Sequence, residues 1–167
     1  MKFEEALQAS LDLQKEHGIQ KMCAYHVGVL YKAFRDEGVE FKVGILVYDG
    51  LFVEHAWLVH RGEVFEASWE FTKYRSLQYM SLREFRARDP DQDWPFIIAK
   101  LALLQSGIGH MDTNWEEYVQ IMTCESTRSR QALIAQREKE IQDSGIVPTA
   151  IVLDEKNLCQ VVAGKKK

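Results

Sequence analysis

The sequence predicts an α+β fold in which N-terminal helices pack on a small antiparallel sheet and a mainly helical half follows. Apolar residues recur at helical spacing over residues 3–36 and then at alternate positions over 39–47. The Asp49–Gly50 dipeptide that follows is a strong signal for a β-hairpin turn. With 167 residues, of which 46% are hydrophobic, the chain is long enough to bury one full core.

Length, charge and cysteine content bound the class of protein. We expect one domain, 1–167, with a catalytic-like core over 1–75, a helical extension over 76–145, and a terminal hairpin with a basic tail over 146–167. A net charge of -4 gives no electrostatic basis for binding nucleic acid. No apolar run approaches the ~20 residues needed to cross a membrane. Without a signal peptide or a disulfide framework, a cytoplasmic location is expected, while the oligomeric state stays open.

Two amphipathic helices are expected at the start of the chain. The first covers residues 3–16 and buries a stripe through Phe3, Leu7 and Leu11. The second covers residues 22–36, and a glycine follows each helix as its terminator.

Three strands and then several helices are expected next. The strands cover 39–47, 53–59 and 63–69, and two-residue turns that end in glycine join them. In the second half, three local patterns predict helix starts. Capping boxes are expected at 81–84 and 113–116, and an Asp–x–Pro pattern predicts a helix over 93–104. The charged segment 127–143 is also helix-prone, with either a solvated face or a partner surface as its role.

A cysteine and a histidine in the first half form a candidate nucleophile and base. A thiol attacks as its thiolate, so a catalytic cysteine needs a pKa below the usual value of about 8.5. Cys23 is in the first turn of a predicted helix, where unpaired N–H groups favour negative charge. His55 shares the apolar face of its strand with Trp57, whereas His60 faces the other side next to a turn. His55 is therefore the expected partner of the thiol.

The register of the second hairpin locates an acid. If Arg61–Gly62 forms the loop, Trp57 lies opposite Glu66 and His55 lies opposite Ser68. Glu66 is then on the face of His55 and diagonal to it, at about 7–8 Å between backbones, which a glutamate side chain can span. At this strand position we expect a half-exposed carboxylate.

Each of these residues also has an ordinary explanation. A helix cysteine is commonly an apolar filler, a strand histidine is commonly half-buried and satisfied, and a strand glutamate is commonly solvated. Their combination on a helix and two successive strands favours a functional site. Metal binding lacks support, because Cys23, Cys124, Cys159 and the five histidines are not at ligand spacing. No nucleotide-binding motif is present, so we expect no cofactor.

The first half of the chain contains a pattern that is typical of a known superfamily. A predicted helix with a cysteine is followed by the segments 54–59 (EHAWLV) and 62–69 (GEVFEASW). Residues 18–70 resemble the papain-like and transglutaminase-like cysteine superfamily. The nearest pattern is that of small bacterial and phage proteins with Glu-His-Ala-Trp-Leu-Val, a glycine turn, and Asp-Pro-Thr-Trp. In this chain, Glu66-Ala67-Ser68 replaces Asp-Pro-Thr.

The resemblance implies Cys23 as nucleophile, His55 as base and Glu66 as acid. The implied reaction is acyl transfer or hydrolysis at an amide or isopeptide bond through a thioester, with a peptide, a protein or another amide as substrate. The further site candidates are the oxyanion donor Gln20 and the auxiliary residues His26, Trp57 and Ser68. The alternative is a catalytically inactive papain-like fold that acts as a protein-binding module.

Overall fold

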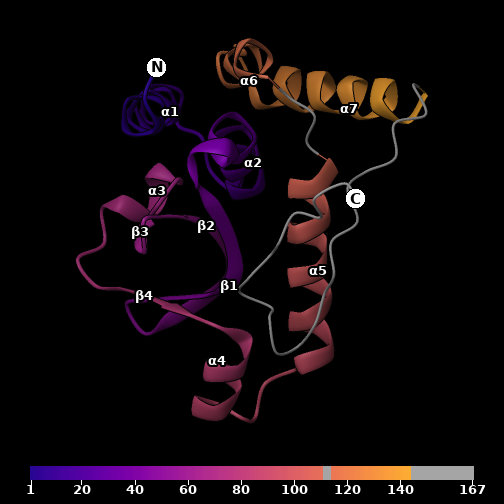
Figure 1. The fold of residues 1–167 in the computed structure, drawn as a ribbon. Helices are drawn as coiled ribbons and strands as arrows, with labels where there is room; N and C mark the ends of the chain where they lie inside the picture. The colour runs from indigo at the N-terminus through magenta and orange to yellow at the C-terminus, as the bar shows by residue number, and fades with distance from the viewer. Residues whose placement is uncertain (111–113, 144–167) are drawn as a thin grey trace.

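The computed structural model describes residues 1–110 and 114–143, and its architecture is α+β, as predicted (Figure 1). Within this part of the chain, four antiparallel strands form one sheet in the order β3-β2-β1-β4. The strands are β1 (Glu40–Tyr48), β2 (Leu51–His60), β3 (Glu63–Phe65) and β4 (Leu77–Met80). The helices are α1 (Phe3–His17), α2 (Cys23–Phe34), the 3₁₀ helix η1 (Arg35–Glu37), α3 (Trp69–Thr72), α4 (Leu82–Arg88), α5 (Trp94–His110), α6 (Trp115–Met122) and α7 (Thr127–Asp143). The predicted hairpin and tail over 146–167 lie outside the described residues.

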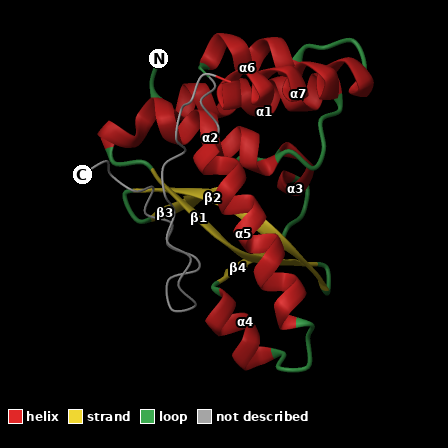
Figure 2. Ribbon diagram, turned by 90° about the vertical axis from the view of Figure 1, so that its right-hand side faces the viewer, coloured by secondary structure: helices red, strands yellow, loops and turns green. Residues whose placement is uncertain are grey.

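Helices surround the curled sheet. Figures 1 and 2 show α5 along one side of the sheet, with α1, α2, α6 and α7 gathered at one end. Helix α5 packs against α2, β1 and β2, and helix α1 packs against α2, α3 and α6. The core between these layers is apolar, and Val27, Leu30, Val43 and Leu58 in it are fully buried. None of the described helices combines the length and apolar content needed to span a membrane.

Both predicted hairpins form, and the three residue pairs next to the Arg61–Gly62 turn have the predicted register. Tyr48 pairs with Leu51, and His60 pairs with Glu63, so each turn contains two residues. The Asp49–Gly50 turn has φ values of 48° and 73°, and the Arg61–Gly62 turn has values of 53° and 78°. Two successive residues at positive φ define the type I′ turn, whose twist matches that of antiparallel strands. Local turn chemistry therefore sets which residues of β2 and β3 face each other.

The third strand is shorter than predicted, and a fourth strand was not predicted. Strand β3 ends at Phe65, whereas the prediction extended it to Trp69. Beyond Phe65, the backbone oxygen of Ala67 and the backbone N–H of Trp69 bond to a glutamine of α1, so they are withdrawn from the strand ladder. Strand β4 is a four-residue edge strand that pairs with β1, and the sheet thus extends past residue 75.

Helices α4 and α5 begin where the sequence predicted, whereas the start of α6 differs. Ser81 and Glu84 form the predicted capping box of α4. Helix α5 begins at Trp94 but continues to His110, beyond the predicted end at residue 104. The cap of α6 is Asn114, whose side-chain oxygen accepts a hydrogen bond from the backbone N–H of Glu117 at 2.9 Å. The cap is therefore one residue later than the box predicted over 113–116, and Thr113 lies outside the described residues.

Gly44 provides space in the centre of the sheet. A Cβ at this position would lie 2.4 Å from the backbone oxygen of Met80 and 2.8 Å from Cη2 of Trp57. We expect Gly44→Ala to lower the free energy of unfolding by about 1–3 kcal/mol, because two strands and an indole would have to move. Urea denaturation measures the change. The matched control is Gly107→Ala, whose added Cβ would lie 3.5 Å from Cβ of Ala24 in ordinary contact; an equal loss there would contradict the steric explanation.

Candidate active site

His55 and Glu66 form a buried ion pair at the centre of the candidate site. His55 lies in the middle of β2, and Glu66 directly follows β3, so the two-residue Arg61–Gly62 turn brings them together. Nε2 of His55 is 2.9 Å from both carboxylate oxygens of Glu66. The side chains of His55 and Glu66 are 1% and 8% exposed. The contact between these two residues is the predicted one, but the pairing ends at Leu58 and Phe65, so the predicted pairs of Trp57 with Glu66 and His55 with Ser68 do not form.

Glu66 is more buried and more fully bonded than a strand carboxylate was expected to be. In addition to His55, its Oε2 accepts a hydrogen bond from the backbone N–H of Ser68 at 2.9 Å. Its Oε1 accepts one from the hydroxyl of Tyr79 on β4, also at 2.9 Å. The expectation of a half-exposed, largely solvated carboxylate was therefore wrong, because the chain leaves the sheet after Phe65 and turns Glu66 inward.

Cys23 is the first residue of α2 and is half-buried. It lies close enough to His55 to be among the groups that raise the pKa of that ring. Since Glu66 occupies Nε2 of that ring, Nδ1 is the nitrogen left for the thiol. The turn before Cys23 is fixed to α3, because the backbone N–H of Lys21 donates to Oε1 of Glu70 at 2.9 Å. The unpaired N–H groups of the first turn of a helix lie next to this sulfur and favour negative charge there.

The charge state of His55 follows from its two partners. Burial opposes protonation of the ring, but the Glu66 carboxylate and the hydrogen bonds to Cys23 and Glu66 raise the pKa of His55 to about 10. An imidazolium at neutral pH stabilises a neighbouring thiolate. The same carboxylate, together with burial, raises the pKa of Tyr79, so its hydroxyl remains a donor to Glu66.

Aromatic rings enclose the histidine. Phe71 of α3 contacts the ring of His55 edge-on, with centroids 4.8 Å apart. Trp57, two residues along β2, stacks at 6.5 Å and also contacts Tyr79 at 5.0 Å. Trp57 is thus an auxiliary wall of the site, which keeps water away from the His55–Glu66 pair and strengthens it electrostatically.

The remaining sequence candidates lie around this centre in different ways. Gln20, the proposed oxyanion donor, is exposed in the turn that precedes α2. His26 is one turn after Cys23 and is buried, and its Nδ1 bonds the hydroxyl of Tyr118 at 2.7 Å. Ser68 is buried, and its backbone N–H rather than its hydroxyl contacts Glu66; among the described residues its Oγ has no hydrogen-bond partner.

Sequence reasoning missed Tyr79 and Gln14. Tyr79 was missed because the short β4 was not predicted. Gln14 was detectable, because Ser10 and Gln14 continue the buried face of α1 after Phe3 and Leu7. Polar residues on the buried stripe of an amphipathic helix must find partners in the interior, which marks them for attention.

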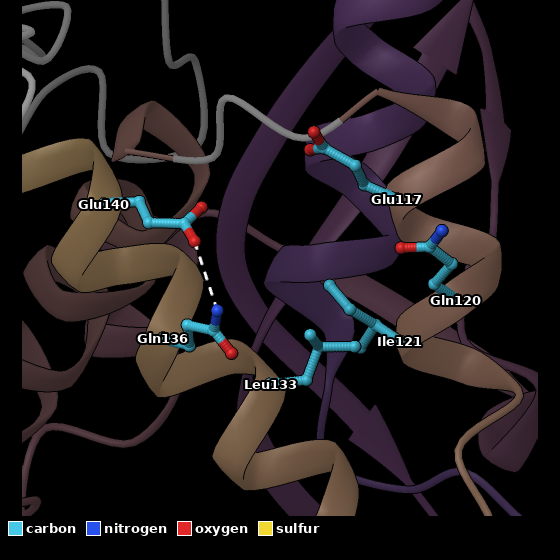
Figure 3. Close-up of a pocket in the computed structure, with 6 residues that line it drawn as sticks. All are labelled: Glu117, Gln120, Ile121, Leu133, Gln136 and Glu140. Atoms are coloured by element: carbon cyan, nitrogen blue, oxygen red, sulfur yellow. Dashed lines mark hydrogen bonds between the residues drawn. The ribbon is translucent and has the colours of Figure 1, made fainter.

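A shallow groove lies away from this site, between α6 and α7. Figure 3 shows its mixed polar and apolar lining, with Gln136 donating to Glu140 at 3.3 Å across one turn of α7. The lining residues are Glu117, Gln120, Ile121, Leu133, Gln136 and Glu140. It contains none of the candidate catalytic residues. In the part of the chain that the structure describes, no cluster of histidine, cysteine and acidic side chains has the composition to hold a metal ion.

Comparisons with known proteins find no relative for this chain. No protein-family model, no curated protein and no solved structure matches it. The interpretation of the site therefore depends on its own geometry.

Proposed function

We propose that this chain is a cysteine-nucleophile enzyme that cleaves or exchanges an amide or isopeptide bond through a thioester. The observation that carries the proposal is the arrangement of His55, which is buried, bonded by Glu66 at Nε2, and close enough to Cys23 for that residue to raise the pKa of the ring. A nucleophile paired with a base that a third group orients is the general signature of covalent catalysis. The likeness of residues 18–70 to the papain-like and transglutaminase-like superfamily supports the same chemistry and the corresponding core fold.

The proposed reaction begins from a thiolate–imidazolium pair. The Cys23 sulfur attacks the carbonyl carbon of the substrate and forms a tetrahedral oxyanion. The C–N bond then breaks, and the His55 imidazolium gives its proton to the departing nitrogen, which leaves a thioester. Water or an amine, deprotonated by His55, attacks the thioester carbonyl and releases Cys23. Peptides and proteins are the proposed substrates, and a reducing, cytoplasmic compartment would keep the nucleophile as a free thiol.

Each residue has a defined task in this scheme. Glu66 holds His55 with Nε2 protonated, so that Nδ1 faces the thiol and accepts its proton. The N–H groups at the start of α2 are the proposed oxyanion donors, because they are preorganised and unpaired within the helix. Gln20, exposed in the preceding turn, is the side-chain candidate for a second donor.

Thiol reactivity across pH tests the proposal directly. We expect Cys23 to react with iodoacetamide well below pH 8, because the imidazolium of His55 stabilises the thiolate. Mass spectrometry of the intact protein, followed by peptide mapping, measures the rate at each cysteine between pH 5 and 9. We also expect amide-derived electrophilic probes to label the wild-type protein but not Cys23→Ser.

Cys124 provides the matched control. It is also half-buried, but it lies beyond the C-terminal end of α6, and its thiol donates to the backbone oxygen of Gln120 at 3.3 Å. Cys124→Ser should leave probe labelling unchanged. Alkylation of Cys23 only near pH 8.5, or only after unfolding, would contradict the enzyme and favour the protein-binding module.

A further inference from the structure

A buried chain of polar side chains links three helices to the segment that carries Glu66. The links are Gln14 Nε2 to Ser10 Oγ at 3.0 Å, Ser10 Oγ to the Tyr118 hydroxyl at 2.7 Å, and that hydroxyl to His26 Nδ1 at 2.7 Å. These four residues come from α1, α6 and α2, and none is more than 1% exposed. A fully bonded buried network fixes its members in one arrangement, since breaking a link leaves a buried polar group unsatisfied.

Gln14 also binds the backbone on both sides of Ser68. Its Nε2 donates to the backbone oxygen of Ala67 at 2.7 Å, and its Oε1 accepts from the backbone N–H of Trp69 at 2.8 Å. Ser68, between them, is the residue whose N–H donates to Glu66. Movement of this segment would therefore move a hydrogen bond that orients the Glu66 carboxylate.

The backbone contacts fix the direction of the Gln14 amide. Trp69 N–H can bond only the oxygen of that amide, so both amide hydrogens are left for Ala67 and Ser10, and Ser10 Oγ accepts from Gln14. Either hydroxyl can be the donor between Ser10 and Tyr118. When Ser10 is the donor, the Tyr118 hydroxyl donates to Nδ1 of His26, and this is the arrangement that the proposal adopts. An imidazole that accepts at Nδ1 carries its proton on Nε2.

We propose that Gln14 and Tyr118 are positioning residues of the candidate site, Gln14 for Glu66 and Tyr118 for the tautomer of His26 beneath Cys23. This inference rests on the proposed function for its catalytic meaning, while the network itself is measurable without activity. It assigns a task to the helical second half, because α6 supplies the hydroxyl that keeps a neutral ring one turn from the nucleophile. Burial and the neighbouring charge of His55 lower the pKa of His26 to about 3, in keeping with a neutral ring.

The test measures ring protonation and thiol reactivity in the full-length protein. We expect ¹⁵N NMR of wild type to show His26 as the neutral Nε2–H tautomer from pH 5 to 8. In Gln14→Met and Gln14→Glu, which cannot donate to Ala67, we expect the ring pKa of His55 to fall by about 1 pH unit as its carboxylate partner loosens. The alkylation rate of Cys23 at pH 6 should fall about tenfold in both variants. In Tyr118→Phe, the His26 ring should populate both neutral tautomers.

Matched controls separate positioning from stability. Gln8→Met removes a glutamine from the exposed face of α1, where it bonds Asp12, and Tyr31→Phe removes a hydroxyl from α2 away from the network; both should titrate as wild type. Unchanged His55 titration in both Gln14 variants, whatever their melting temperatures, would overturn the inference, as would an Nδ1–H tautomer of His26 in wild type. If these NMR results are as expected but Cys23 reacts as an ordinary thiol, the positioning network is supported and the proposed enzymatic function is contradicted.

Discussion

Replacing Glu66 with glutamine is expected to lower turnover by up to ~10⁴, by analogy with the loss of the orienting acid in a serine protease triad. The glutamine amide has one acceptor and one donor where the carboxylate has two acceptors. The Ser68 N–H requires the acceptor on its side, so the NH₂ group would lie where Oε1 now meets Tyr79 and His55. The amide oxygen would still lie where Oε2 is now 2.9 Å from Nε2, but the negative charge that favours the protonated ring would be lost. The Cys23 thiolate would then lose the imidazolium that stabilises it.

Thiol reactivity reports this change before any substrate is known. We expect alkylation of Cys23 in Glu66→Gln to require a pH near that of an ordinary thiol, about 8.5. We also expect the free energy of unfolding to fall by about 1–3 kcal/mol, because a hydrogen-bonded buried charge is lost. Guanidinium denaturation measures the second effect.

Glu63→Gln is the matched control for this prediction. Glu63 is exposed at the start of β3 and pairs with His60, on the far side of the strand from His55. It should change neither thiol reactivity nor stability. Wild-type thiol reactivity in Glu66→Gln would remove Glu66 from the site and leave a Cys23–His55 dyad.

In Cys23→Ser, folding stability is expected to be greatest near pH 6.5 and to fall on both sides because of two buried histidines. The serine is needed because the proton that a Cys23 thiolate loses on folding would offset the proton that His55 keeps. His55 has a pKa raised to about 10, so its stabilising effect is complete below the unfolded value of about 6.5 and is lost as the pH rises through 10. His26 has a pKa lowered to about 3. As the pH falls from 6.5 to 3, this histidine binds a proton in the unfolded state but not in the folded state, so the folded state loses stability. Each histidine gives a slope of up to about 1.4 kcal/mol per pH unit within its window.

Single substitutions added to Cys23→Ser identify which histidine causes each slope. Urea denaturation at a series of pH values should show a flattened alkaline side, between pH 6.5 and 10, in His55→Gln. The acid side should flatten in His26→Gln, apart from the contribution of carboxylates that all folded proteins show. His17→Gln, at the end of α1, serves as the control and should retain both slopes. A Cys23→Ser protein of constant stability from pH 6.5 to 9 would show that His55 does not hold its proton.

Much of the fold and the central pair of the site followed from local chemistry. The helix with Cys23, the two type I′ turns and the alternation of β2 depend on neighbouring residues, and local patterns report such neighbours well. The turn at Arg61–Gly62 was sufficient to place Glu66 on the face of His55, because a two-residue loop fixes which residues oppose each other. The contact between His55 and Glu66 was therefore accessible from sequence.

The environment of that pair depended on residues far apart in the chain. Tyr79 reaches Glu66 only because β4 pairs with the far edge of β1, and such a short edge strand has little local signal. Just beyond the end of β3, the backbone groups of Ala67 and Trp69 bond to Gln14, which is more than fifty residues earlier in the chain.

The amino-acid sequence by itself identified the residues of the candidate site: a cysteine at the start of a helix, a histidine on a strand, and an acid that follows the next two-residue turn. The tertiary structure decided what these residues are chemically. The Glu66 side chain is buried and bonded by Tyr79, so little water screens its charge, and this charge raises the pKa of His55 to about 10. Screening and burial depend on every element packed around a group, so no local pattern specifies them.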